Sequence, residues 1–314
     1  MSPRILLIGK NGQVGSELAG LLPSLCNVVA LDRTQLDISK PDEARRAIRD
    51  FRPQLIVNAA AYTAVDKAES DEAMAETINA DFPALLAEEA KRIGAAVVHY
   101  STDYIFDGLK NTPYDESDPP NPVSVYGKTK LAGEQAIRDS GVPHLIFRTA
   151  WVYSTRGRNF LLTILRLASQ REELRIVCDQ IGAPTWSHEI ARATTAVLEQ
   201  LLKPETDSFS LERVSGTYHM TASDHTTWYG FAQAILEEVS QAPAQLSWLT
   251  SATDGRRIVA RRIVPITTAE YPTPARRPRY SVLSTVLLGQ TFGVQLKGWR
   301  VQLHSAFASG LHPD

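Results

Sequence analysis

The sequence predicts a Rossmann-type α/β fold, a doubly wound parallel sheet covered by helices, with a smaller C-terminal lobe. First, an apolar run at residues 4–8 leads through a glycine-rich turn into a helical pattern. Second, strand-like and helix-like segments alternate to about residue 150, as in right-handed β-α-β units. Third, this alternation loosens afterwards. We therefore expect residues 1–150 to form the main domain and residues 151–314 to form most of the lobe, interleaved with the main domain through a further strand near 217–220.

The composition is that of an ordinary globular protein. The chain has 314 residues and a formal net charge of −2, so neither nucleic acid nor an anionic membrane is an expected partner. No apolar run approaches the roughly eighteen residues that a membrane span needs. The N-terminal apolar run is typical of a first strand, not of a signal peptide. Cys26 and Cys178 lie far apart, which predicts neither a disulfide framework nor a metal site and agrees with a cytoplasmic location.

The turn after the first strand reads Gly-Lys-Asn-Gly-Gln-Val-Gly at residues 9–15. Its glycines permit a tight turn and a close approach of phosphate, and the following helix N-terminus attracts a pyrophosphate. The sequence therefore predicts that this turn binds a dinucleotide. The residues expected to make the contacts are Gly9, Gly12, Gln13, Val14 and Gly15.

The next two segments bear on which dinucleotide binds. A second strand at 28–31 ends at Asp32, where a ribose-binding carboxylate belongs. Arg33 beside it favours a 2′-phosphate instead, so NADH and NADPH both stay open. Asp37 and Ile38 precede a helix at 41–51, and Asp37 is equally a capping residue or an adenine contact.

Two further strands lead to the same sheet edge. The strand at 55–58 is followed by small residues, and Ala61, Tyr62 and Thr63 are expected beside a flat ligand. A long helix is expected over 71–93. The strand at 96–101 contains His99, expected as a packed or hydrogen-bonded residue, and delivers Thr102 and Asp103 to that edge. A surface loop at 107–122 then leads to the next helix.

That helix carries Tyr126 and Lys130, four residues apart and thus on one face. A nearby ammonium lowers the pKa of a phenol, and a tyrosine tuned in this way can transfer a proton near neutral pH. The pattern is common on ordinary helices and indicates catalysis only together with Thr102, whose hydroxyl could hold the same substrate oxygen, and with the dinucleotide turn.

The lobe is expected to contribute further contacts. A fifth strand at 144–148 is followed by Trp151, which is either a core residue or a stacking surface for sugar or nicotinamide. Helices are expected at 158–170, 188–202 and 227–239, with a strand at 175–178. Of the arginines between 256 and 279, those in the proline-rich group at 272–278 are the best placed to hold a ligand phosphate, and Arg277 is the candidate.

Several stretches together resemble the extended short-chain dehydrogenase/reductase superfamily and, within it, the dTDP-4-dehydrorhamnose reductases. The glycine turn and Tyr-x-x-x-Lys are shared by the whole superfamily. Ala-Val-Asp-Lys-Ala-Glu at 64–69, Asp-Gln-Ile-Gly-Ala-Pro-Thr at 179–185 and Arg-Pro-Arg-Tyr-Ser at 277–281 are similar to this reductase family alone. The matches keep the family's order over most of the chain.

The resemblance implies reduction of the 4-keto group of dTDP-4-dehydro-β-L-rhamnose by NADH or NADPH. Tyr126 would donate the proton and Thr102 would hold the reacting oxygen. Lys130 would lower the pKa of Tyr126 and contact the nicotinamide ribose. Asp103 and Trp151 would face the sugar, with Arg277 as a further substrate contact.

Two alternatives and two departures accompany this resemblance. A related nucleotide-sugar epimerase or dehydratase is disfavoured because Tyr104 follows Asp103 where a dehydratase needs a second acid. A non-catalytic, NADP-binding regulatory subunit would not need Thr102, Tyr126 and Lys130. Tyr280 stands where the family often has Asn. Arg300 follows Trp299 where some members carry a magnesium-binding glutamate, so we expect no metal and a monomer or weak homodimer.

Overall fold

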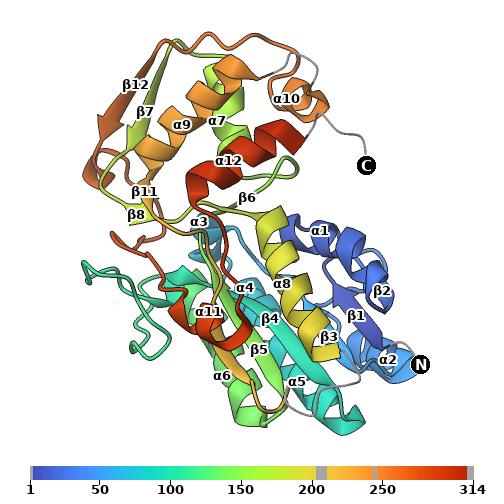
Figure 1. The fold of residues 1–314 in the computed structure, drawn as a ribbon. Coiled ribbons are helices and arrows are strands. Elements are labelled where there is room, and N and C mark those ends of the chain that lie inside the picture. Colours follow the sequence, from blue (N-terminus) through green and yellow to red (C-terminus); the bar gives the residue numbers. More distant parts are fainter. Residues whose placement is uncertain (1–2, 203–210, 243–245, 310–314) are drawn as a thin grey trace.

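The computed structural model describes residues 3–202, 211–242 and 246–309 (Figure 1). Its main sheet has six strands in the order β10-β5-β4-β3-β1-β2, and every neighbouring pair is parallel. The strands are β1 (Arg4–Ile8), β2 (Asn27–Leu31), β3 (Leu55–Asn58), β4 (Ala96–Thr102), β5 (His144–Thr149) and β10 (Gly216–His219). The predicted doubly wound parallel sheet is therefore confirmed, and the order in which successive strands are added reverses between β1 and β3.

Helices cover both faces of this sheet, which explains why its strands read as continuous apolar runs. Leu7 of β1 faces a core shared with helices α1, α8 and α11, whereas Leu6 faces a core shared with α2, α5 and α6. The bounds of these helices are α1 (Gln13–Leu21), α2 (Pro41–Phe51), α5 (Phe82–Ile93), α6 (Val125–Ser140), α8 (Ser187–Leu202) and α11 (Val286–Phe292). Helices α8 and α11 and strand β10 come from beyond residue 150, so the later chain returns to the sheet.

The prediction of a single helix over 71–93 is wrong in detail. The chain forms α4 (Glu72–Glu76), a π-helical segment (Thr77–Asp81) and then α5. The wider π turn carries the buried Asn79 toward α6, whose Gly133 lies against the Asn79 carbonyl. Short helices at Leu22–Ser24 and Val65–Ala68 complete this part of the chain.

The lobe packs around its own apolar core beside the carboxyl ends of the strands (Figure 1). Three two-stranded pairs contribute to it: β6 (Val152–Tyr153) with β9 (Thr185–Trp186), β7 (Glu173–Val177) with β12 (Arg262–Ile266), and β8 (Ile181–Gly182) with β11 (Thr226–Thr227). Its helices are α7 (Phe160–Ala168), α9 (Trp228–Gln241), α10 (Ser247–Ala252) and α12 (Trp299–Ala308), and a short helix spans Thr268–Glu270.

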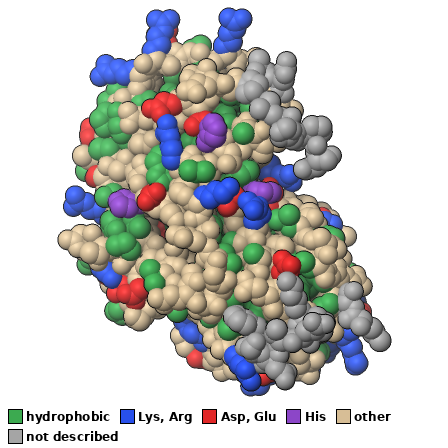
Figure 2. Space-filling model, in the orientation of Figure 1, with side chains coloured by type: hydrophobic (Ala, Val, Ile, Leu, Met, Phe, Trp, Pro, Cys, Tyr) green, Lys and Arg blue, Asp and Glu red, His purple; other side chains and the backbone are tan. Residues whose placement is uncertain are grey.

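The surface agrees with the small net charge. On the face shown in Figure 2, basic and acidic side chains are interspersed and neither sign forms a continuous field. Among the helices of the described residues, none has both the length and the apolar character needed to cross a membrane.

The contact between α6 and the π turn predicts a stability effect. A Cβ added at Gly133 would lie 2.1 Å from the Asn79 backbone oxygen. We expect Gly133→Ala to lower the free energy of unfolding by about 1–3 kcal/mol, the usual cost of overpacking. Gly20→Ala, in α1 with nothing within 4 Å, should leave stability unchanged or raise it by up to about 1 kcal/mol. Urea titrations measure both, and equal effects would contradict the packing argument.

Candidate active site

Thr102 and Asp103 lie at the carboxyl end of β4. The buried Thr102 caps the short helix Asp103–Ile105, because its hydroxyl accepts a hydrogen bond from the Tyr104 amide at 3.1 Å. The same hydroxyl donates to Oδ1 of Asp103 at 3.1 Å. The strand end thus presents a fixed hydroxyl beside a carboxyl group.

Tyr126 lies opposite, in the first turn of α6. The helix begins there because Ser124 caps it, accepting from the Gly127 amide at 3.2 Å. The Tyr126 ring contacts Tyr104 edge to face, with centroids 5.7 Å apart. Desolvation by the surrounding protein raises the pKa of Tyr126 to about 12, while a hydrogen bond with Thr102 lowers it and the charge of Asp103 raises it. The phenol therefore holds its proton at neutral pH.

Lys130 is buried one turn further along the helix. Its Nζ donates to the backbone oxygen of Tyr100 at 2.6 Å and lies 3.1 Å from Nε2 of His99. Burial lowers the pKa of Lys130 to about 8. Burial, rather than Lys130, dominates the pKa of Tyr126 in this structure, because the amine is directed at β4. That Lys130 lowers the pKa of the phenol during the reaction stays a prediction. His99 is, as expected, buried and hydrogen-bonded.

Asp103 lies in the protein interior, where burial disfavours the charged form of its carboxyl group. It is 1 % exposed, and burial raises its pKa to about 6 despite hydrogen bonds that favour the carboxylate. Among the described residues no donor reaches its Oδ2 in hydrogen-bond geometry, although the nearby Ser281 side chain favours the carboxylate. A buried acceptor without a partner is costly, which marks a place where a ligand hydroxyl can bind.

The glycine turn has the geometry that a dinucleotide requires. Gly9 has φ +89°, and a Cβ there would lie 2.8 Å from the Ala60 amide nitrogen, while one at Gly15 would lie 2.1 Å from the Gly9 oxygen. Helix α1 begins at Gln13 without a side-chain cap, so its first amides stay available to an anion. These features fit a pyrophosphate at the turn. Val14 contributes to the core beside the turn.

The Gln13 side chain bonds to two residues beyond position 150, which the sequence did not reveal. Its Oε1 accepts hydrogen bonds from Ser154 Oγ and Asn159 Nδ2, both at 3.0 Å. Asn159 also caps α7 by accepting from the Leu162 amide. The side chain of Gln13 therefore joins the dinucleotide turn to the first turn of a lobe helix.

The carboxylate oxygens of Asp32 already accept several hydrogen bonds from nearby residues. Its Oδ1 accepts from the Thr34 amide and hydroxyl and its Oδ2 from Asn11, while Lys10 Nζ lies 3.6 Å away. These hydrogen bonds, led by the Thr34 hydroxyl, lower the pKa of Asp32 to about 2. Arg33 beside it is exposed. The loop thus presents two cations next to a carboxylate that has few free lone pairs.

The remaining expected cofactor residues have local partners. Asp37 accepts from the Ser39 amide and hydroxyl within its loop, while α2 has Lys40 as N-cap and no side-chain cap, and Ile38 packs against the core. The segment Ala61–Thr63 is held at Tyr62, whose amide and carbonyl both bond to the Asn79 side chain at 2.9 and 3.1 Å. Sequence reasoning missed Asn79 because nothing in its local pattern indicates a π turn.

Trp151 is held by the lobe. It adopts φ 46°, and its ring stacks on Trp228 with centroids 3.4 Å apart and planes 3° from parallel. The Trp228 indole donates to Gln180 Oε1 at 3.1 Å. Neither Gln180 nor Trp228 was named as a site residue from the sequence: Gln180 belongs to the 179–185 motif without an assigned role, and Trp228 carries no motif of its own.

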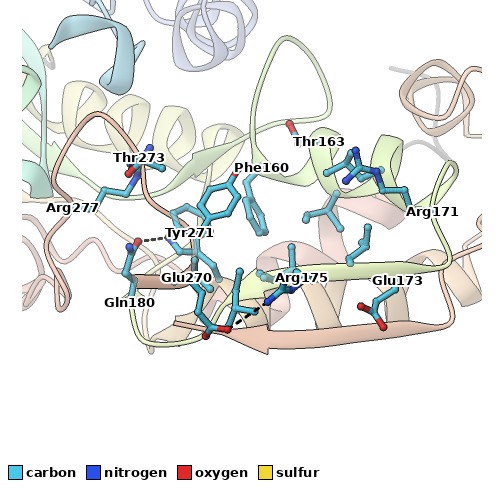
Figure 3. Close-up of a pocket in the computed structure, with 17 residues that line it drawn as sticks. Phe160, Thr163, Arg171, Glu173, Arg175, Gln180, Glu270, Tyr271, Thr273 and Arg277 are labelled. Atoms are coloured by element: carbon cyan, nitrogen blue, oxygen red, sulfur yellow. Dashed lines mark hydrogen bonds and ion pairs between the residues drawn. The ribbon is translucent and has the colours of Figure 1, made fainter. Parts of the chain in front are cut away.

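A cavity that Trp228 lines has a volume of about 600 Å³ (Figure 3). It is walled by α7, β7, the start of α9 and the 266–277 segment. Its lining is Phe160, Thr163, Ile164, Leu167, Arg171, Glu173, Leu174, Arg175, Ile176, Val177, Gln180, Trp228, Ile266, Glu270, Tyr271, Thr273 and Arg277. Arginines thus meet aromatic rings in one concave space, the combination that binds a phosphorylated ring compound.

Arg277 lies at one end of this cavity. Its guanidinium donates to Asp66 at 2.8 Å, to the Ala275 carbonyl at 3.1 Å and to Thr273. Arg175 faces Glu270 at 3.4 Å elsewhere in the lining. The expected Arg277 therefore lines this cavity, while Arg171 and Arg175 were not anticipated.

The C-terminal segment also fixes the loop between Asp103 and α6. Tyr114 pairs with Leu283, and Gly108, with φ +81°, lies so close to Pro278 and Arg279 that a Cβ there would meet the Arg279 nitrogen at 2.5 Å. Tyr280 is buried in the apolar cluster of this loop. Tyr280 therefore contributes apolar packing at the position where the family often has Asn.

Comparison with known proteins supports one family. The family model described as RmlD substrate binding domain matches residues 3–311. A curated dTDP-4-dehydrorhamnose reductase from Burkholderia thailandensis is 47 % identical over 298 residues, 95 % of each chain. A crystal structure of a dTDP-4-dehydrorhamnose reductase from Clostridium acetobutylicum superposes with TM-score 0.85 at 35 % identity, covering 98 % of this chain and 99 % of that one. A Bacillus anthracis structure of the same kind, in complex with NADP, gives 0.83 at 30 % identity, covering 98 % and 100 %.

The burial of Asp103 predicts a pH-dependent stability. Its pKa is raised from 3.8 to about 6 in the folded protein, so the unfolded chain ionises first and stability is lost as pH rises through that window. We expect Asp103→Asn to be about as stable as the parent near pH 4 and more stable by up to about 3 kcal/mol at pH 8. Denaturant titrations across that pH range measure the difference, and a pH-independent difference would contradict the assignment.

Proposed function

We propose roles for the residues of this site on the premise that the chain belongs to the dTDP-4-dehydrorhamnose reductase family. It is an NAD(P)H-dependent oxidoreductase that reduces the 4-keto group of dTDP-4-dehydro-β-L-rhamnose, the last step of dTDP-rhamnose biosynthesis. The observation that carries the function is 47 % identity to a curated reductase over 95 % of both chains. The epimerase, dehydratase and regulatory-subunit alternatives have no comparable support.

Tyr126 is the proton donor in this proposal. Bound nicotinamide supplies a hydride to the ketone carbon, and the ketone oxygen then needs a proton. With a pKa of about 12, Tyr126 is protonated at neutral pH and is still a stronger acid than the sugar alcohol that forms. Thr102 holds the reacting oxygen from the strand side, an oxyanion-hole type of role. Lys130 contacts the cofactor ribose and supports the phenolate once it forms.

Asp103 and Trp151 orient the sugar. The unpartnered Oδ2 of Asp103 accepts a hydrogen bond from a sugar hydroxyl, which relieves its buried, unsatisfied state. The Trp151–Trp228 stack borders the lobe cavity, because Trp228 lines that cavity. We further propose that the residues after 150 supply the substrate-binding lobe and that residues 1–150 bind the cofactor.

The nucleotide part of the substrate occupies the lobe cavity. Arg175 and Arg277 bind the diphosphate, since guanidinium groups match phosphate oxygens in pairs. The pyrimidine ring packs among Phe160, Trp228 and Tyr271, which line the same space. Phosphate would replace the carboxylates of Glu270 and Asp66 as partners of these arginines.

The cofactor lies across the carboxyl ends of β1 and β2. Gly9, Gly12 and the first amides of α1 bind its pyrophosphate, and Asp37, Ile38 and Ala61–Thr63 line its adenine and nicotinamide halves. NADPH is favoured over NADH, because Asp32 already accepts several hydrogen bonds while Arg33 and Lys10 offer charge to a 2′-phosphate.

A cytoplasmic location fits the two free thiols, Cys26 and Cys178. For the assembly we propose a monomer or weak homodimer without a bridging metal. Arg300 of α12 pairs with Glu237, and the described residues contain no group of three potential metal-ligating side chains. Size-exclusion chromatography with and without a chelator tests this, and a dimer that the chelator dissociates would contradict it.

Tyr126→Phe tests the proton donor. We expect turnover to fall by about 10²–10⁴-fold, the usual worth of a general acid, while the affinity for NADPH stays within about twofold. Tyr218→Phe is the matched control, because Tyr218 is a tyrosine of β10 whose hydroxyl bonds to the Val214 carbonyl and to Thr291 of α11. Full activity in Tyr126→Phe would refute the role.

Arg33→Ala tests cofactor preference. Removing a guanidinium from the 2′-phosphate should raise the KM for NADPH about tenfold and leave that for NADH nearly unchanged. Arg46→Ala removes an equally exposed charge from α2 and should change neither constant. Equal effects on both cofactors in Arg33→Ala would show that Arg33 does not read the phosphate.

A further inference from the structure

His99 connects two side chains of the site in a way that the reaction does not by itself require. It lies in β4, and its register partner in β3 is Asn58, so their side chains project on the same face of the sheet. Helix α6 covers that face and brings Lys130 to the other side of the imidazole. The three side chains are all buried and form one row.

The backbone fixes the direction of hydrogen bonding at the first member. The Ala60 amide donates to Oδ1 of Asn58 at 3.2 Å, which identifies that atom as the amide oxygen. The other amide atom, Nδ2, is then a donor, and it lies 3.1 Å from Nδ1 of His99. Nδ1 must therefore be the acceptor nitrogen of the imidazole.

This direction is transmitted to Lys130. A neutral imidazole that accepts at Nδ1 carries its proton on Nε2, and Nε2 lies 3.1 Å from Lys130 Nζ. An ammonium group has three donors and no lone pair, so it cannot accept from Nε2–H. An uncharged amine can accept there and still donate to the Tyr100 oxygen at 2.6 Å.

We propose that Asn58 holds His99 with its proton on Nε2, and that His99 thereby stabilises Lys130 as an amine that takes up and releases a proton near neutral pH. His99 is then a positioning residue, and the inference rests on the proposed reductase function. The step is a proton exchange in which the amine lone pair takes a proton from solvent and the ammonium returns it, without a change of oxidation state.

The groups around Lys130 are consistent with this assignment. Burial keeps the imidazole neutral by holding the pKa of His99 well below 6.5, and burial also lowers that of Lys130. Glu134, one turn along α6, raises the pKa of Lys130, but its carboxylate is already paired with Arg148 at 2.7 Å and Arg138 at 2.9 Å. Tyr126 and Asp103 lie on the substrate side.

The two states of Lys130 match the two halves of the reduction. The amine leaves Tyr126 as a neutral phenol, which is the form that donates a proton. The ammonium favours the phenolate that remains afterwards. Reaching the ammonium state requires His99 to move its proton to Nδ1 and Asn58 to turn its side-chain amide. The Asn58 NH2 group then faces the Ala60 N–H, so that two donors meet without an acceptor.

Asn58→Asp separates this account from a structural role. A carboxylate accepts from Ala60 with one oxygen and from His99 Nδ1–H with the other, so Nε2 becomes an acceptor for charged Lys130. Nitrogen NMR of the full-length protein labelled with ¹⁵N-histidine identifies which ring nitrogen is protonated, and carbon NMR of lysine Cε follows the Lys130 titration. Asn27→Asp adds the same charge at an exposed position of β2 and is the control.

We expect the Nε2–H tautomer in the parent and in Asn27→Asp, and the Nδ1–H tautomer in Asn58→Asp with the Lys130 midpoint raised by about one pH unit or more, tenfold in the ionisation constant. An Nδ1–H tautomer in the parent would overturn the inference, as would an unchanged Lys130 midpoint in Asn58→Asp. The parent measurement decides even if Asn58→Asp does not fold. Because neither readout needs turnover, the expected spectrum in a protein that reduces no ketone would refute the proposed function, while the assignment of the His99 tautomer and its effect on Lys130 would stand.

Discussion

The hydrogen bond from Lys130 to the Tyr100 carbonyl determines where the site forms. It ties the first turns of α6 to the last residues of β4, and only this docking brings Tyr126 opposite Thr102. Burying an amine is costly without partners. Here a backbone oxygen and His99 satisfy it, so the cost is lowest when helix and strand sit in this one relation. Catalytic geometry and helix docking thus have the same cause.

A second layer of polar groups supports that contact. Glu134 forms a buried, bidentate ion pair with Arg148 of β5. The Asn79 side chain links the segment after β3 to Thr129 of α6. Buried pairs of this kind add little stability compared with apolar packing, but each has one satisfied geometry. They hold the ends of two strands and one helix in register, at the sheet edge where parallel strands place their functional residues.

Local patterns predicted the parts of this structure that depend on local physics. The apolar runs, the glycine turn and the spacing of Tyr126 and Lys130 identified the sheet, the cofactor turn and the helix face, because each is decided within about ten residues. The partner of Lys130 was not predictable in this way, since the β4 carbonyl and His99 become its neighbours only after docking. The lobe cavity was missed for the same reason: Arg175, Gln180 and Trp228 meet from separate segments that carry no shared pattern.

The central claim is that this sheet edge directs a hydride to one sugar carbon and a proton to its oxygen. The most direct test supplies the protein with dTDP-4-keto-6-deoxyglucose, a 3,5-epimerase and NADPH fully deuterated at the transferable nicotinamide carbon. The account predicts oxidised cofactor and dTDP-L-rhamnose that carries deuterium at sugar C4, seen by mass spectrometry and proton NMR. Cofactor that stays reduced, or a product without deuterium at C4, would contradict it.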